Sequence, residues 1–324
     1  MKPLFTPDNH PLILAPMADL THAGFRLLID HYGGCDLFYS EMIDARLYRQ
    51  GGPLEKYYDS VEPGSDKVIF QLIGADREDM TASALKLARL NPAGIDINMG
   101  CSAPHIIKVK AGCALMRDRT KAAELVKSLR DALPPEIAVS AKLRLGERED
   151  GEALISFASS LEQAGADFLV LHPKTRKEKA ARIPRKEYIG LLQRELNIPV
   201  VANGHINSPA EYKLCREKQQ PGGTMIGRQA TRQPWFFALL KDQAPHQIDL
   251  EECWDRFYEL LQLHQPPEFH KTRARRFSLY FSENLRFGYH LHASKIANAK
   301  SAEEMDQYYR EYFAQHREEQ NVIT

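Results

Sequence analysis

The chain has 324 residues, 43% hydrophobic and 27% charged, and no apolar run reaches the roughly 18 residues that a membrane-spanning helix needs. Its 43 basic and 43 acidic residues cancel, and its five scattered cysteines form no CxxC pair, so we expect neither a disulfide framework nor a metal site. The amino terminus, MKPLFTPDNHP, lacks the apolar segment of a signal peptide, and we therefore expect a cytoplasmic protein with no membrane anchor.

Eight short apolar segments recur along the chain, with amphipathic helical stretches between most of them. Near-continuous apolar character is typical of parallel strands that are covered on both faces of the sheet. The predicted strands are 12–18, 37–43, 67–74, 94–100, 138–146, 168–173, 199–206 and 224–228, and the predicted helices include 77–90, 120–133, 152–164, 185–196 and 208–217. Eight such units predict an α/β fold, a closed (β/α)₈ TIM barrel. An open Rossmann-like sheet is the alternative, but no GxGxxG follows the first strand.

The strand pattern stops after about residue 243, and the remaining chain has helical spacing. Helices are predicted over 249–265 and 301–318, and a basic helical pair over 270–300 with a break near Gly288. We therefore predict two domains, a barrel over 1–243 and a small helical domain over 244–324.

Polar residues stand at the carboxyl ends of the predicted strands, which is where a (β/α)₈ enzyme carries its site. They are Met17, Glu41, Gln71, Asn98 with Cys101, Lys142 with Arg144, His172, Asn203, and Gly227 with Arg228. Asn203-Gly204 and Gly227-Arg228 end the last two strands, where barrel enzymes commonly bind a phosphate. Two tight turns without a ligand are the alternative at that place.

A charged lysine is costly on an apolar strand unless it has a partner, and a flavin or an anionic intermediate would serve Lys142 in that way. Gln71 and His172 have the hydrogen-bonding groups for a flat heterocycle and an anion. FMN fits the pocket that these residues outline. Cys101 follows the fourth strand directly and is a candidate proton donor, whereas the other four cysteines are expected to be small buried residues.

The ordered motifs resemble the bacterial type of the tRNA-dihydrouridine synthase family. They are APMADLTHAGFR (15–26), DINMGCSAP (96–104) followed by AGCALM (111–116), AKLRLG, LHPKT, VANGHI and MIGRQATRQPWFF. The resemblance is close over about residues 12–240 and looser over the basic tail. The sequence departs from the family pattern at Ser102, Asp19, His205, Gln229 and Lys174, where proline, glycine, an acidic residue, glycine and arginine are usual.

The resemblance implies an FMN-dependent oxidoreductase on a barrel with a helical tRNA-binding domain. FMN would contact Pro16, Met17, Gln71, Lys142, His172, Asn203, Gly204, Gly227 and Arg228. Asn98 would orient the target uracil, FMN reduced by NADPH would give a hydride to C6, and Cys101 would give a proton to C5. The uridine would have to leave its stack to reach the flavin.

Two basic segments, 174–186 and 271–300, are expected to hold the tRNA. The residues expected to contact the substrate RNA are Arg144, Lys174, Arg176, Arg273, Arg275 and Arg276, in addition to Asn98. Aromatic residues interleave the second segment, which favours RNA, although some must pack its own helices. A solvated helix face is the alternative for both segments, and 174–186 also suits a loop over the site. We expect a monomer.

Two other functions share parts of this pattern. An FMN-dependent barrel reductase of a small pyrimidine-like substrate would use the same barrel, but it has no need of a basic helical tail. A non-catalytic RNA-binding protein would have no need of the polar residues at the strand ends. A bound flavin and activity on tRNA rather than on free uracil distinguish the three.

Overall fold

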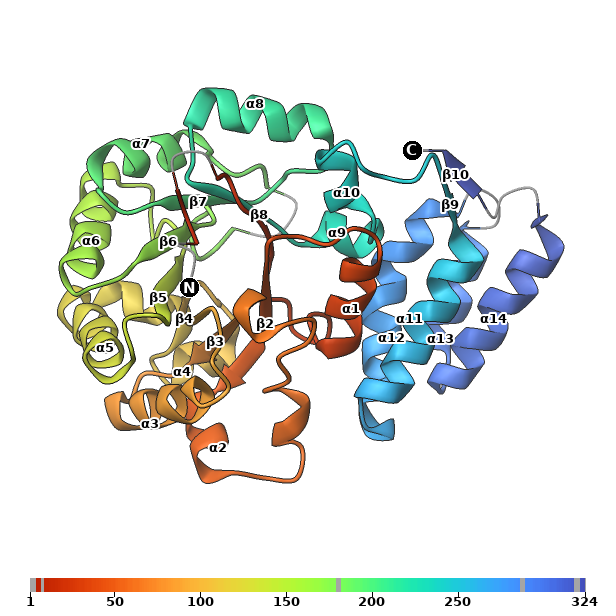
Figure 1. The fold of residues 1–324 in the computed structure, drawn as a ribbon, viewed down its shortest axis with the longest axis horizontal. Helices are drawn as coiled ribbons and strands as arrows, with labels where there is room; N and C mark the ends of the chain where they lie inside the picture. The colour runs from red at the N-terminus through yellow and green to blue at the C-terminus, as the bar shows by residue number, and fades with distance from the viewer. Residues whose placement is uncertain (1–3, 7–8, 179–181, 286–288, 318–320, 324) are drawn as a thin grey trace.

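The computed structural model describes residues 4–6, 9–178, 182–285, 289–317 and 321–323, with the backbone alone for 289–293. Eight parallel strands close into a barrel in chain order (Figure 1). They are β1 (Leu12–Leu14), β2 (Leu37–Asp44), β3 (Val68–Ile73), β4 (Gly94–Met99), β5 (Ala138–Leu143), β6 (Phe168–Leu171), β7 (Val200–Asn203) and β8 (Gly223–Ile226). Ile13 pairs with Leu37 on one side and Met225 on the other, which closes the ring. The predicted TIM barrel is confirmed, and the open sheet is excluded.

Several strands end before the predicted segment does. Pro16 has no amide hydrogen to continue the β1 ladder, and Gly204 leaves extended geometry after β7 with φ of 112°. The residues beyond these points form the loops at the carboxyl end of the barrel, so the predicted segments included loop as well as strand.

The five helices predicted between the strands are present, and the structure adds further helices around the barrel that were not predicted. Together they are α1 (Ala23–His31), α2 (Ala45–Gln50), α3 (Arg77–Ala88), α4 (Pro104–Lys108), α5 (Arg119–Ala132), α6 (Gly151–Gln163), α7 (Glu187–Glu195), α8 (Pro209–Gln219), α9 (Arg228–Arg232) and α10 (Phe236–Leu240), with the 3₁₀ turns η1 (Glu55–Tyr57), η2 (Ser65–Lys67) and η3 (Gly112–Arg117). Asp76, Asp118 and Asp150 cap α3, α5 and α6 by accepting backbone N–H groups, which explains where these helices begin.

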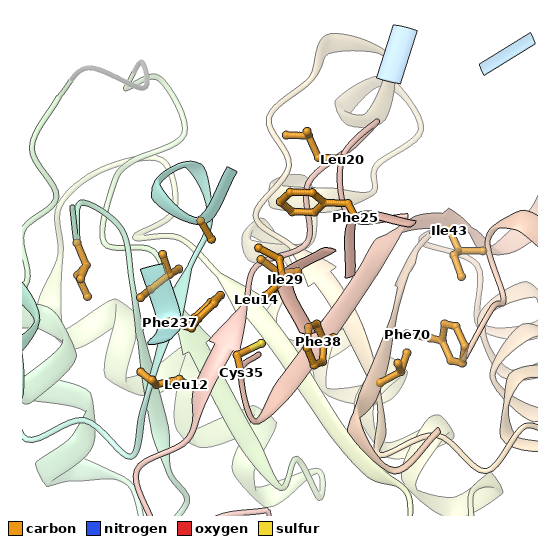
Figure 2. Close-up of a cluster of buried hydrophobic side chains, with 14 of the residues drawn as sticks. Leu12, Leu14, Leu20, Phe25, Ile29, Cys35, Phe38, Ile43, Phe70 and Phe237 are labelled. Carbon is orange, nitrogen blue, oxygen red and sulfur yellow. The ribbon is translucent and has the colours of Figure 1, made fainter. Parts of the chain in front are cut away.

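Successive strand residues divide between two apolar layers. Ile13 and Tyr39 belong to the cluster inside the barrel, while Leu12, Leu14 and Phe38 belong to the larger cluster between strands and helices. Figure 2 shows part of the outer layer, where strand side chains lie near others from α1. Both faces of each strand are therefore buried, which is why the strands read as continuous apolar runs.

Within its described residues, the chain after the barrel forms four α-helices and a small sheet, which lie on one side of the barrel (Figure 1). The elements are β9 (Gln247–Asp249), α11 (Leu250–His264), α12 (Pro267–Phe281), η4 (Ser282–Asn284), α13 (Tyr289–Asn298), α14 (Ala302–Gln315) and β10 (Asn321–Ile323). Helix α11 packs on α1 so closely that a Cβ at Gly24 would lie 2.6 Å from the Leu260 carbonyl oxygen. The antiparallel β9–β10 pair was not predicted, because three-residue strands show no usable periodicity. The division at residue 243 falls between α10 and β9 and stays a prediction.

Aromatic side chains form the centre of this helical region. Trp254 stacks on Tyr309 at 3.7 Å between ring centroids, and Phe257 stacks on Phe277 at 3.9 Å. Phe277 and Phe281 are fully buried, so these two of the interleaved aromatics serve the core rather than a surface for RNA. Phe287 and the side chain of Tyr289 lie outside the described residues. Across the part of the chain that the structure describes, no helix is long and apolar enough to span a membrane.

Candidate active site

A cavity opens at the carboxyl end of the barrel, between the loops that follow β1, β5, β6, β7 and β8. Eight of the nine residues predicted to bind the cofactor line it, namely Pro16, Met17, Lys142, His172, Asn203, Gly204, Gly227 and Arg228. These residues come from across more than 200 positions of sequence, and they meet because parallel strands in a closed barrel all end on the same face.

Two glycines shape the wall of this cavity. A Cβ at Gly204 would lie 2.6 Å from Cδ2 of His172, and a Cβ at Gly227 would lie 3.2 Å from Sδ of Met17. Asn203 ties the two turns together, because its Nδ2 donates to the Met225 carbonyl oxygen at 3.0 Å. The turns after β7 and β8 therefore leave little room for side chains at the cavity wall, a feature that suits a phosphate site.

The cavity is cationic. Lys142 and Arg228 line it, and no aspartate or glutamate is among the described lining residues. Burial lowers the pKa of Lys142 to about 8, with a further lowering from nearby Arg144 and an opposing effect from Asp96. Burial and the cations around it, Lys142 foremost, lower the pKa of His172 to about 2. At neutral pH the site therefore holds a neutral imidazole beside positive charge, an arrangement suited to an anion.

Gln71, the ninth residue, lies inside the barrel rather than on the cavity wall. Its Nε2 donates to Oδ2 of Asp96 at 2.7 Å, and its Oε1 accepts from Nδ2 of Asn98 at 2.8 Å. Asp96 also accepts from the Ser140 hydroxyl at 2.7 Å, and burial raises its pKa to about 6. Sequence reasoning missed Asp96, although its position two residues before Asn98 puts both side chains on the inward face of β4.

This hydrogen-bonded chain ends at the Cys101 loop. Oδ1 of Asn98 accepts the backbone N–H groups of Gly100 at 3.1 Å and Cys101 at 2.9 Å. Arg144 donates from Nε to the Gly100 carbonyl oxygen at 2.8 Å. The Cys101 carbonyl oxygen accepts from the Cys113 amide at 2.9 Å. Asn98, Arg144 and the Cys113 amide therefore all hold the backbone of this loop. Cys101 itself is half-buried.

Gly112 lets η3 approach the cysteine loop. It has φ of 60°, and a Cβ there would lie 2.5 Å from the Cys101 carbonyl oxygen. The other four cysteines, Cys35, Cys113, Cys215 and Cys253, are buried as predicted. Among the described residues, no group of three or more His, Cys, Asp and Glu side chains is placed to hold a metal ion.

The basic segment 174–186 does not form a free cationic surface over its described residues. Lys174 is buried, with 1% of its surface exposed. Arg176 pairs with Glu147 at 2.7 Å, and Arg185 pairs with Glu178 at 2.5 Å. Arg144 donates to the Thr175 carbonyl oxygen at 3.2 Å, so Arg144, Lys174 and Arg176 gather beside the Cys101 loop. Several cations of the described segment are therefore buried or ion-paired against the barrel, while Lys177 is exposed.

The three arginines of α12 have different surroundings. Arg273 is buried and pairs with Glu41 of β2, Arg275 donates to the Ala299 carbonyl oxygen at 3.0 Å, and Arg276 is exposed. The prediction that Arg273 contacts RNA therefore does not fit its location. The helical spacing could have predicted this burial, because Arg273 precedes the core residue Phe277 by four positions and so lies on the buried face of the helix.

A closed (β/α)₈ barrel with cations, glycine turns and a cysteine loop gathered at one mouth is the architecture of a barrel enzyme, and the cations at that mouth suit an anionic ligand. The chain belongs to the dihydrouridine synthase family, whose model matches residues 13–322. It is therefore an enzyme of that family.

Individual relatives agree with this assignment. A protein of Aquifex aeolicus named probable tRNA-dihydrouridine synthase is 31% identical over 78% of this chain and 79% of its own length. The tRNA-dihydrouridine(16) synthase of Cupriavidus necator is 34% identical over 70% of this chain and 72% of its own. The tRNA-dihydrouridine synthase B of Pseudomonas aeruginosa is 34% identical over 70% of this chain and 67% of its own.

Proposed function

We propose that this chain is a tRNA-dihydrouridine synthase that binds FMN in the barrel cavity, is reloaded by NADPH and reduces the C5–C6 double bond of uridines in tRNA. The observation that carries the proposal is the meeting of the cationic cavity and the Cys101 loop at one barrel mouth. The family and the names of the relatives support the same substrate.

The residues of the cavity fit FMN. Arg228 and the glycine turns at Gly204 and Gly227 suit the phosphate, and Lys142 suits the electron-rich edge of a reduced flavin ring. His172 is neutral near pH 7, so it can donate one hydrogen bond without adding charge. When bound, FMN supplies the hydride that C6 of uracil receives.

Cys101 would supply the proton at C5. Adding hydride to C6 leaves negative charge spread from C5 to the C4 carbonyl, and protonation at C5 completes the reduction. A proton donor must sit at hydrogen-bonding distance from its target, so its loop has to be held in place. Asn98 and Arg144 do this through the backbone of residues 100 and 101. Asn98 keeps a second amide hydrogen, which suits the proposed contact with the target uracil.

The cavity is enclosed by residues at and after the ends of the barrel strands, so a uridine in folded tRNA would have to be turned out of its stack to enter. Exposed cations on the helices beside the barrel suit the RNA backbone; Lys271 and Arg276 of α12 are two that face solvent. They replace Arg273 in the proposed RNA contact.

The test is a visible spectrum of the purified protein, followed by NADPH and then unmodified tRNA or free uridine without oxygen. A flavin spectrum that bleaches with NADPH and recovers only with tRNA is expected. Recovery with free uridine alone would favour a small-molecule reductase. If the protein binds no FMN, the proposal is wrong.

A further inference from the structure

We propose that the buried Glu41–Arg273 ion pair is a positioning link through which the carboxyl-terminal helices hold the β1–α1 turn, and with it one wall of the flavin cavity. Arg273 would thus be a positioning residue rather than an RNA contact. The inference rests on the proposed binding of FMN in that cavity.

The ion pair joins two parts of the chain that are far apart in sequence. Nη1 of Arg273, on α12, lies 2.5 Å from Oε2 of Glu41, on β2, and the two side chains are 2% and 6% exposed. The guanidinium also lies over the rings of Phe269 at 4.9 Å and Tyr58 at 5.9 Å. Burial raises the pKa of Glu41, and the charge and hydrogen bond of Arg273 oppose that rise and so favour the ionised carboxylate.

The second oxygen of Glu41 is bonded to the β1–α1 turn. Oε1 accepts the backbone N–H of Asp19 at 2.7 Å. Asp19 has φ of 62°, a left-handed conformation that favours glycine and costs energy for aspartate. The bond to a buried carboxylate offsets that cost, so one carboxylate connects α12 to a strained turn.

That turn carries the cavity wall. Residues 17–21 form a tight turn, because the Leu20 and Thr21 N–H groups both donate to the Met17 carbonyl oxygen at 3.1 Å. The Thr21 hydroxyl accepts the Met17 N–H at 3.0 Å. Met17 and Pro16 line the cavity, and Met17 is the side chain against which Gly227 packs. A shift of Asp19 would therefore move the wall that faces the proposed phosphate site.

The experiment measures FMN affinity by flavin fluorescence in the full-length apoprotein, without RNA or NADPH. Arg273→Met should raise the FMN dissociation constant by about 2-fold to 30-fold, the range of couplings between linked sites. Arg273→Lys keeps the charge and should recover most of the lost affinity.

Two control variants test whether a change in FMN affinity comes from loss of the Glu41–Arg273 pair or from general destabilisation of the fold. Arg276→Met removes the same charge three residues further along α12, where the side chain is exposed, and should leave FMN affinity unchanged. Trp254→Phe removes the indole N–H that donates to Asp306 at 2.9 Å and should lower the melting temperature of the helices without changing FMN affinity.

If Arg273→Met binds FMN as tightly as the wild type, the pair only fixes the helices to the barrel and the inference is wrong. If Arg273→Met is insoluble, Glu41→Asp provides the test, because the shorter carboxylate cannot reach both Asp19 and Arg273. Unchanged FMN affinity in Glu41→Asp would also overturn the inference. If the wild-type protein binds no FMN, the proposed function is wrong. If the wild type binds FMN and the variants bind it equally well, only the inference about the ion pair is wrong.

Discussion

The barrel mouth and helix α12 both carry basic side chains, but the two regions use them differently. Lys142 and Arg228 line a cavity with no carboxylate among its described residues, and neither forms an ion pair within the described chain. Arg273 of α12 is buried against Glu41, and Arg276, three residues away, faces solvent. Positive charge at the mouth therefore suits a ligand, whereas on α12 the charge divides between holding the fold and facing the solvent.

The largest effect is expected at the mouth, from Cys101→Ala. Loss of the proton donor should reduce dihydrouridine formation on tRNA by about 10²-fold to 10⁴-fold, the usual contribution of general acid catalysis, while the flavin spectrum is retained. Turnover measured with unmodified tRNA checks this. The control is Cys215→Ala, which removes a buried thiol from α8. If Cys101→Ala turns over at the wild-type rate, Cys101 is not the proton donor at the barrel mouth.

A smaller effect is expected from Asn98→Ala, which removes the oxygen that holds the Gly100 and Cys101 amides. Because the thiol would lose its fixed position, turnover should fall by about 10²-fold or less. FMN affinity should be little changed, since Asn98 does not line the cavity. Single-turnover kinetics with prereduced enzyme measure this step directly. A loss of FMN instead would place Asn98 in the cofactor site.

Lys142→Met should weaken FMN binding by about 10-fold to 100-fold, the range for a lost hydrogen bond to a charged group. The pKa of Lys142 lies at about 8, so its protonated form attracts the anionic cofactor below that pH. FMN affinity of the wild type should therefore fall as the pH rises through about 8. Fluorescence titrations from pH 6 to 9 measure the trend. If FMN affinity falls with pH as steeply in Lys142→Met as in the wild type, another group causes the pH dependence.

The smallest effect is expected on α12. Arg276→Gln should weaken tRNA binding by a few-fold and lower the slope of log affinity against log salt by about 1, because one phosphate contact is lost. Filter binding at several salt concentrations measures the slope. Lys127→Gln, on the far exposed face of α5, is the comparison variant. If Arg276→Gln and Lys127→Gln behave alike, the exposed face of α12 does not contact RNA.

The sequence by itself determined the barrel, because each strand and helix has a local apolar pattern that does not depend on distant residues. It also determined that Lys142, His172, Asn203 and Gly227 would meet, since strand ends in a closed parallel barrel share one face. The order of the motifs further predicted the family.

Only the tertiary structure decided which charged residues are buried and with whom they pair. The partner of Arg273 lies 232 positions away, and Arg176 pairs with Glu147, which lies outside the basic segment 174–186. The position of Gln71 beneath Asn98 likewise depends on the contact between β3 and β4. Residue type sets the charge of a side chain, but its partner depends on how distant segments pack, and local patterns do not carry that information.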